Sequence, residues 1–295
     1  MNHKLVHFFW IAALMLLVAC GRDEEVGTAS PPTTPVTAVG TDVSELQISV
    51  VSDDFAVGTP RVPFILYNGP SRVSDAQQVK VTAFDLAQEP AKAEWTGWAT
   101  GYGDYAVPYW VVYPDLPRAG NWGLFAQIAL ADGRSTEAQF VVEVLEQSRY
   151  PSIGDIPPHS ENRTLTTEPD IKKLTSAFDP NPAFYQMTVK EAVANEQPSV
   201  VVFSTPGFCQ TAFCAPVLGS SEEVYTSFGD QANFIHIEVY KQFNPELVLA
   251  DEMAEWKLMT EPWTYVLDRD GRVVARFGGP VSPRELTAAL ESLLQ

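Results

Sequence analysis

Three cysteines carry the chemistry that this sequence could perform: Cys20, Cys209 and Cys214. Cys209 and Cys214 are separated by four residues, in a C-x-x-x-x-C arrangement. A thiolate is a good nucleophile, and two thiols this close in the chain can interconvert with a disulfide. Cys20 lies far from this pair, at the end of an apolar run. The Cys209–Cys214 pair is therefore the first candidate for a reactive site.

The residues around Cys20 indicate an export signal. The unbroken apolar run from Phe8 to Val18 is too short to cross a bilayer as a helix, but suits the core of a signal peptide. The segment Leu17-Val18-Ala19-Cys20 resembles the lipobox of bacterial lipoproteins. This resemblance implies a signal peptide over 1–19 and a lipid on Cys20; an ordinary secretory signal is the alternative. We expect an envelope protein that is lipid-anchored on the extracytoplasmic face of a bacterial membrane, where surroundings are oxidising.

Composition limits the function classes. The 295 residues are enough for about two domains, and 45% of them are hydrophobic. Lys and Arg number 19 against 37 Asp and Glu, which gives a formal net charge of −18. Such a surface repels phosphate groups. We therefore expect neither nucleic-acid binding nor attachment to a membrane through a cluster of basic residues. Attachment to a membrane would have to come through Cys20.

The mature chain divides into regions of different composition. Residues 20–44 carry the anchor and then a tether rich in Pro, Thr and Gly. Residues 45–147 alternate apolar and polar side chains in short runs, which predicts an all-β immunoglobulin-like sandwich of about seven strands. Residues 148–185 are a Pro-rich connector, and residues 186–295 form a second domain.

The second domain shows an α/β pattern. Continuous or alternating apolar runs predict strands over 199–203, 234–240, 263–267 and 272–277, and helical periodicity predicts helices over 211–228, 247–258 and from Pro283 onward. Thr188 and Glu191 form a capping box that opens a further short helix. The two cysteines come where the first of these strands leads into its helix. We expect a central mixed sheet with helices on both faces.

This order resembles the thioredoxin fold over residues 186–295. The segment from Glu261 to Asp268, followed by Asp270-Gly271, is similar to the cis-proline segment and hairpin of exported thioredoxin-like proteins, and 215–218 to the proline-bearing part of the active-site helix. The resemblance implies thiol–disulfide exchange on envelope proteins, without a cofactor. It implies Cys209 as the attacking thiolate, Cys214 as the resolving thiol, and Pro262 as a cis residue that holds the partner's backbone.

The cysteine spacing departs from the C-x-x-C of thioredoxins. Residues five apart on a regular helix have Cα atoms roughly 8–9 Å apart, whereas a disulfide needs less than about 7 Å. Either Cys209 lies in the loop ahead of the helix, or the first helical turn must unwind. Phe203 stands where thioredoxin has a buried proton-transferring Asp. Glu238 could replace that acid if it faces the cysteines.

Three other functions compete with exchange. The C-x4-C pair resembles a peroxiredoxin subfamily, but Pro206 and Pro262 stand where that family needs a hydroxyl and an Arg. Soft thiolates with His236 loosely resemble Sco-type copper-delivery proteins, which would give the metal set Cys209, Cys214 and His236; a hydrogen-bonded core His is the alternative. Finally, the bridge could be structural, in a redox-silent adaptor.

Overall fold

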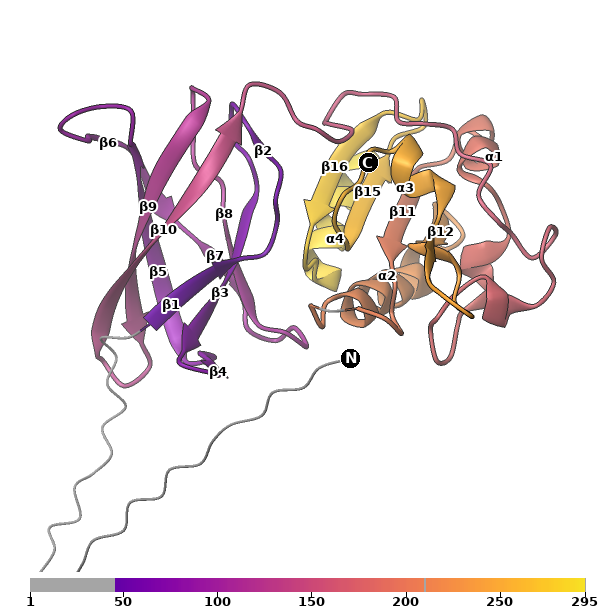
Figure 1. The fold of residues 1–295 in the computed structure, drawn as a ribbon, viewed down its shortest axis with the longest axis horizontal. Coiled ribbons are helices and arrows are strands. Elements are labelled where there is room, and N and C mark those ends of the chain that lie inside the picture. The colour runs from indigo at the N-terminus through magenta and orange to yellow at the C-terminus, as the bar shows by residue number, and fades with distance from the viewer. Residues whose placement is uncertain (1–45, 210, 295) are drawn as a thin grey trace, which may run out of the picture. The chain divides into compact units, whose positions relative to one another are not determined.

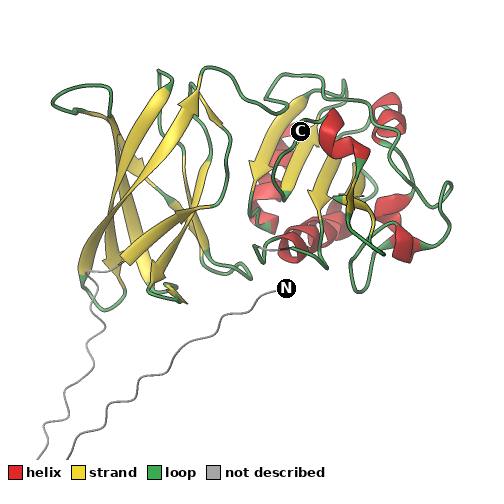
Figure 2. Cartoon of the chain, in the orientation of Figure 1, coloured by secondary structure: helices red, strands yellow, loops and turns green. Residues whose placement is uncertain are grey.

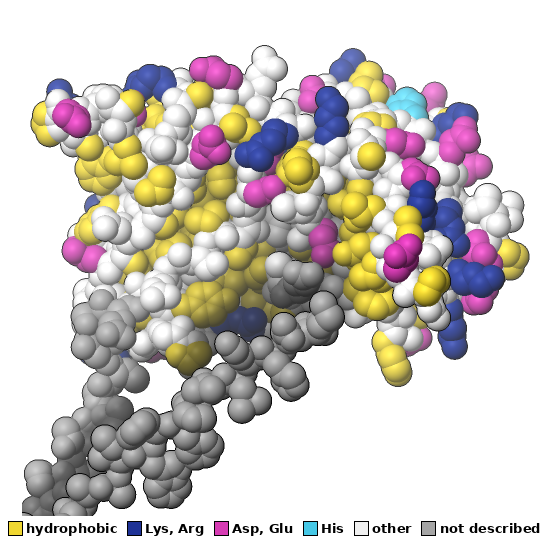
Figure 3. Space-filling model, viewed as in Figure 1, with side chains coloured by type: hydrophobic (Ala, Val, Ile, Leu, Met, Phe, Trp, Pro, Cys, Tyr) yellow, Lys and Arg dark blue, Asp and Glu magenta, His cyan; other side chains and the backbone are white. Residues whose placement is uncertain are grey.

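The computed structural model describes residues 46–209 and 211–294, so Cys20, the signal peptide and the tether lie outside the described residues. The described residues belong to one compact unit. Among them, helices occur only in the C-terminal part (Figure 2). None of the helices in the described part of the chain is both long and apolar enough to span a membrane. Acidic and basic side chains are interspersed on the face drawn in Figure 3.

The N-terminal part consists of two five-stranded β-sheets (Figure 1). One has the order β1-β3-β8-β7 with β4 on β3, and the other the order β2-β10-β9-β5-β6. Their bounds are β1 (Leu46–Val50), β2 (Phe55–Ala56), β3 (Val62–Asn68), β4 (Ser71–Arg72), β5 (Ala76–Asp85), β6 (Ala93–Trp98), β7 (Thr100–Tyr102), β8 (Tyr109–Val112), β9 (Gly120–Leu130) and β10 (Ser135–Leu145). Three of these strands are only two or three residues long. Such short strands show no clear alternation, which is why the sequence predicted fewer strands than the structure has.

Buried and more exposed side chains alternate along the long strands, and the buried ones form a core between the two sheets. In β9, Trp122, Leu124, Ala126 and Ile128 are buried, while the residues between them are more exposed. They pack with side chains of the facing sheet, such as Phe64 and Leu66. Burial of one side of each strand is the expected result of a period-two pattern. The pattern predicted a β-sandwich here, and the two sheets form one.

The segment 148–185 is packed, although its composition resembles a connector. It contains two short 3-10 helices, Ile171–Lys173 and Pro182–Tyr185, and its buried side chains include Tyr150, Leu174, Phe184 and Tyr185. Phe184 lies against Phe234 with ring centroids 5.6 Å apart. The apolar residues are too widely spaced to produce a helical or strand period, so sequence periodicity could not reveal this packing.

The C-terminal part is built on a four-stranded sheet of order β12-β11-β15-β16. β11 runs parallel to β12 and antiparallel to β15, which pairs antiparallel with β16. The elements in chain order are α1 (Val189–Ala194), β11 (Ser199–Ser204), α2 (Cys214–Phe228), β12 (Asn233–Glu238), β13 (Tyr240–Gln242), β14 (Val248–Leu249), α3 (Asp251–Glu255), β15 (Trp263–Leu267), β16 (Val273–Gly278) and α4 (Pro283–Leu294). This topology is that of a thioredoxin-like domain.

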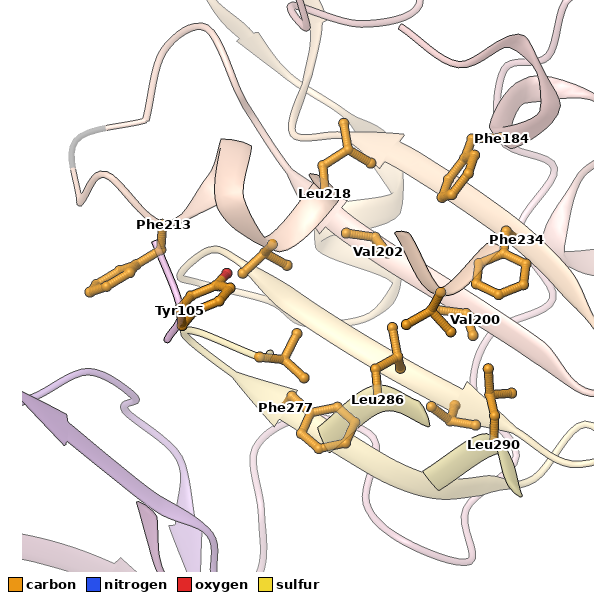
Figure 4. Close-up of a cluster of buried hydrophobic side chains, with 14 of the residues drawn as sticks. Tyr105, Phe184, Val200, Val202, Phe213, Leu218, Phe234, Phe277, Leu286 and Leu290 are labelled. Carbon is orange, nitrogen blue, oxygen red and sulfur yellow. The ribbon is translucent and has the colours of Figure 1, made fainter. Parts of the chain in front are cut away.

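Strand β11 is buried on both faces, as its continuous apolar run predicted. Val200 and Val202 face a core shared with α2 and α4, to which Leu218 and Leu286 belong (Figure 4). Val201 and Phe203 face the other core, which α1 and α3 cover. A central strand covered by helices on both sides can hold the loop at its carboxyl end in a fixed place, and that loop carries the cysteines.

Two predicted helices differ from the observed ones. The helix expected from 211 begins at Cys214, because Ala212 has a left-handed backbone (φ 64°) that no α-helix accommodates. The helix expected over 247–258 is only Asp251–Glu255, preceded by β14. Lys257, also left-handed (φ 58°), prevents its extension.

Candidate active site

Cys209 and Cys214 form a disulfide at the carboxyl end of β11. Their Cα atoms are 5.9 Å apart, within the range that a disulfide requires. Cys209 belongs to the loop that follows Ser204, whereas Cys214 is the first residue of α2. Of the two arrangements that the spacing allowed, the structure therefore has the one in which Cys209 precedes the helix and no helical turn is unwound.

The environment of Cys209 favours a thiolate. Its side chain is partly exposed, and its Sγ accepts a hydrogen bond from the backbone N–H of Cys214 at 3.3 Å. The Thr211 hydroxyl lies 3.3 Å from the same sulfur. The N–H of Cys214 belongs to the first turn of α2, where helical N–H groups lack intrahelical acceptors. These donors and the positive end of the helix dipole would stabilise a negative sulfur after reduction.

Cys214 has a different environment, because it is buried and next to an acid. Its Sγ lies 2.9 Å from Oε2 of Glu261. Burial, with a smaller contribution from the charge of Glu238, raises the pKa of the half-buried Glu261 carboxyl to about 7, although a hydrogen bond from the Thr205 backbone acts to lower it. Among the described residues, no Lys or Arg lies within ion-pair distance of Glu261. A carboxyl with a pKa near neutrality can both donate and accept a proton at the Cys214 sulfur.

Glu238, the acid considered from the sequence, does not contact the sulfurs. Its Oε2 accepts hydrogen bonds from the backbone N–H and the hydroxyl of Ser176, at 2.8 and 2.7 Å. The Ser176 hydroxyl also accepts the N–H of Gly207 at 2.9 Å. A side chain at Gly207 would collide with Ser176, so the loop that carries Cys209 is held against the segment 148–185 only because this residue is glycine. Glu238 thus supports the loop and acts on Glu261 through its charge.

Pro262 follows Glu261 and directly precedes β15, and the Glu261–Pro262 peptide is cis. Its carbonyl accepts the N–H of Gly279 at 2.9 Å. Without an N–H of its own, Pro262 cannot donate to a neighbouring strand. The residue that the resemblance singled out therefore lies next to Glu261, on the same rim as the cysteines, while its proposed role in holding a partner stays a prediction.

His236 is not brought to the cysteine pair. It is buried on β12, with the Tyr185 hydroxyl 2.7 Å from Nδ1 and the Ser204 hydroxyl 2.9 Å from Nε2. Burial lowers its pKa to about 4, so the ring is neutral. This is the hydrogen-bonded core histidine that the sequence offered as the alternative to a metal ligand. The metal-compatible donors that converge here are instead Cys209, Cys214 and Glu261, within 4.8 Å of one another. In the disulfide the two sulfurs are bonded to each other.

Two aromatic residues near the cysteines, Phe203 and Phe208, have different surroundings. Phe203 is fully buried and packs against Trp256, with ring centroids 4.9 Å apart, so it belongs to the core. Phe208, just before Cys209, is 40% exposed and lies 5.5 Å from the ring of Phe243. An exposed aromatic residue next to the more accessible sulfur is suited to contact a partner.

Sequence reasoning missed the role of Glu261. The only available signal was its position directly before Pro262, which itself was a candidate site residue. Nothing in the spacing indicates that this carboxyl reaches a sulfur 47 residues earlier, because the contact depends on the pairing of β11 with β15. Ser176 gave no signal at all.

Comparisons with known proteins give weak structural likenesses. No protein-family model and no curated protein matches the chain. Among solved structures, a thioredoxin-family thiol:disulfide interchange protein from Chlorobium tepidum is 13% identical and covers 49% of this chain and 99% of its own, with a TM-score of 0.35. A DsbF homologue from Corynebacterium diphtheriae is 17% identical, with 36% and 77% covered and a TM-score of 0.31.

A third similar structure is that of CopC from Methylosinus trichosporium. It is 14% identical, covers 32% of this chain and 84% of its own, and has a TM-score of 0.24. Scores this low carry no argument about activity. The functional assignment therefore depends on the topology and on the contacts of the two cysteines.

Proposed function

We propose that this chain is a membrane-anchored, extracytoplasmic thiol–disulfide exchange protein that acts on protein thiols or disulfides of the cell envelope. The observation that carries the proposal is the asymmetry of the disulfide. Cys209 is accessible and faces helical N–H donors, whereas Cys214 is buried and contacts a carboxyl whose pKa is about 7. A purely structural bridge needs neither feature.

The exchange follows from this asymmetry. A partner thiolate attacks Sγ of Cys209, which forms a partner–Cys209 mixed disulfide and breaks the Cys209–Cys214 bond. The electron pair of that bond leaves on Cys214, whose sulfur takes the proton of the Glu261 carboxyl. A second partner thiolate then attacks the partner's sulfur in the mixed disulfide. The partner gains a disulfide and loses two electrons, and this chain is left with two reduced cysteines; the reverse sequence reduces a partner.

Each residue has a separate task in these steps. When Cys209 is the leaving group, the N–H of Cys214 stabilises the negative charge on its sulfur. Glu261 moves the proton at the Cys214 sulfur in both directions. Pro262 would hold the backbone of the partner beside Cys209, because the missing N–H keeps this edge from pairing internally.

The first test is the midpoint potential of the Cys209–Cys214 pair, measured on protein that starts after residue 44. We expect a value well above about −300 mV, which separates exchange-competent pairs from structural ones. A lower value, or reduction only after unfolding, would instead support a redox-silent adaptor.

A trapping experiment tests the assignment of the two cysteines. In Cys214→Ser the mixed disulfide on Cys209 cannot be resolved, so it should accumulate with envelope proteins. The matched control, Cys209→Ser, keeps one thiol but buries it, and we expect it to trap none. Equal trapping by both variants would contradict the assignment of Cys209 as the attacked sulfur.

The anchor is tested separately. Cys20→Ala should move the protein from the membrane fraction to the soluble envelope fraction, since two acyl chains on one residue suffice for stable attachment. A variant that stays on the membrane would overturn lipidation at Cys20 and leave the exchange proposal untouched.

A further inference from the structure

A cavity of about 480 Å³ opens beside the disulfide, and its walls come from both halves of the described chain. One wall contains Thr211 and Phe213, from the loop between the cysteines, and the segment Thr260–Trp263, which includes the two site residues Glu261 and Pro262. The other wall is formed by Ser49–Asp53, at the end of β1 and just after it, together with Tyr67 of β3. The β-sandwich thus borders the candidate site.

The sandwich wall is fixed in place by specific contacts. The Thr260 hydroxyl donates to Oδ1 of Asp53 at 2.9 Å, and the Tyr150 hydroxyl donates to Oδ2 at 2.7 Å. Arg276 forms an ion pair with the buried Asp54 at 2.9 Å. Gly279, with φ +77°, lies so close to the Val51 carbonyl that no side chain fits there. Such tight contact over consecutive residues positions β1 relative to Pro262.

Strand β1, which contributes to this wall, is the terminal strand of its sheet. It pairs with β3, and it also comes close to β10 of the second sheet. A terminal strand leaves every second N–H and C=O without a partner in the sheet, and an extended peptide can pair with them. Ser49 and Val50, both cavity-lining, belong to this strand. Opposite them, Pro262 adds no N–H that would close the cavity by pairing with β1.

The lining is acidic. The described residues that line it supply the carboxyl groups of Asp53 and Glu261 but no Lys, Arg or His. The whole chain has a formal net charge of −18. A positively charged side chain is the group that such a cavity would bind best, since complementary charge favours both encounter and correct orientation.

We propose that this cavity binds an extended polypeptide segment of the exchange partner that carries a basic side chain next to its cysteine. The sandwich then selects the substrate: strand β1 pairs with the segment's backbone, and the carboxylate of Asp53 receives the basic side chain while the cysteine reaches Cys209. This inference rests on the proposed exchange function. It adds to that function a substrate class and a task for the sandwich.

The test separates binding from exchange. Two fluorescent peptides of identical length are used, in which Ser replaces the cysteine and the flanking positions are either Lys or Glu. We expect wild-type protein to bind the Lys peptide at least tenfold more tightly, a difference in Kd measurable by fluorescence anisotropy. Equal affinity for both peptides would overturn the proposal, even if the disulfide exchanges readily.

Variants locate the binding site. Ser49→Lys places a positive charge and extra bulk in the cavity and should weaken binding of the Lys peptide about tenfold or more. Gln47→Lys is the matched control, since Gln47 is also exposed on β1 but does not line the cavity. Equal effects of the two variants would show that only overall charge matters, which would overturn the cavity as the binding site.

Exchange is then measured with the cysteine-containing Lys peptide and with dithiothreitol, a small neutral dithiol that needs no groove. Ser49→Lys should lower kcat/KM for the peptide about tenfold, whereas the control Gln47→Lys should leave the reactions with the peptide and with dithiothreitol unchanged. Loss of binding with intact exchange would overturn the cavity proposal alone. Lysine-selective binding without any exchange, even with dithiothreitol, would overturn the exchange function while keeping the cavity. Displacement of the peptide by a low-molecular-weight disulfide at equal concentration would show that the occupant is a small thiol compound instead.

Discussion

Two glutamates in this protein, the buried Glu285 and the half-buried Glu261, have opposite surroundings. Glu285, on α4, forms two hydrogen bonds of 2.8 Å with the guanidinium of Arg61 from the sandwich, and a third of 2.5 Å with the Tyr109 hydroxyl. Glu261 contacts a sulfur, and the described residues place no cation beside it. The pKa of Tyr109 is raised well above its usual range, by burial and then by the charge of Glu285.

The comparison shows how a neighbouring cation decides the role of a shielded carboxylate. Beside Arg61, Glu285 forms an ion pair that links α4 to the sandwich, so its contribution is to structure. Without a cation, Glu261 has a pKa near neutrality, which suits it to the proton transfer proposed at the Cys214 sulfur. Variants that add or remove charge at the two sites can break or sharpen this contrast.

The largest effect is expected at the ion pair between Arg61 and Glu285. Arg61→Met leaves Glu285 as a buried charge without its cation, which should lower the free energy of unfolding by about 3–5 kcal/mol. Urea denaturation measures this loss. The double variant Arg61→Met/Glu285→Met should recover most of it, because no buried charge remains. A matched control, Lys190→Met, removes an exposed ion pair with Glu161 and should cost far less.

At Glu261, which has no cation beside it among the described residues, the expected effect is on the rate at which the disulfide opens. Glu261→Gln keeps the shape of the side chain but cannot transfer a proton, so opening of the disulfide should slow by roughly 100-fold. Single-turnover reduction by dithiothreitol, corrected for its thiolate fraction between pH 5.5 and 8.5, measures the step. In the wild type this corrected rate should fall as pH rises through about 7, because Glu261 loses the proton that Cys214 needs. The same pH dependence in Glu261→Gln would contradict the role of Glu261.

The pH dependence of stability provides a third, smaller test. The pKa of Glu261 in the folded protein, about 7, lies above its ordinary value of 4.5, so the folded state binds the proton more tightly than the unfolded state. Its stabilising contribution is complete below pH 4.5 and is lost as pH rises to about 7. The difference in unfolding free energy between the wild type and Glu261→Gln should therefore decline over this window. A difference that is constant with pH would contradict the shifted pKa.

The smallest effect concerns the coupling between acids. Glu238→Gln removes a negative charge that raises the pKa of Glu261 while keeping the hydrogen bond from Ser176. The midpoint of the corrected rate profile should move to lower pH by a fraction of a unit. A shift to higher pH would show that the carboxyl of Glu238 acts on the disulfide by another route.

Much of this fold could be predicted from the sequence, because the spacing of apolar residues indicates many of its strands and helices. The run 199–203 indicated a strand buried on both faces, and β11 is one. The capping box of Thr188 and Glu191 opens α1, with both of its hydrogen bonds formed. The start of α2 was less accessible, because it depends on a left-handed conformation at Ala212 that no residue type requires.

The candidate site was predictable only in part. Cys209, Cys214 and Pro262 were found because residue type and motif single them out. Glu261, Ser176 and the sandwich wall at Ser49–Asp53 were not, because each acquires its place through contacts between segments distant in the sequence. Patterns in a short stretch of sequence indicate the local backbone structure. They do not indicate contacts between distant segments, on which these residues depend.

One contact at the start of α2 has a consequence for the speed of the redox cycle. The N–H of Cys214 binds the sulfur of Cys209, and this bond does not require the covalent link between the two sulfurs. After reduction it keeps Cys209 close to the helix, so the pair retains a high effective concentration of one sulfur towards the other. Re-formation of the disulfide then needs little chain rearrangement, and Cys214 is placed to resolve a mixed disulfide on Cys209.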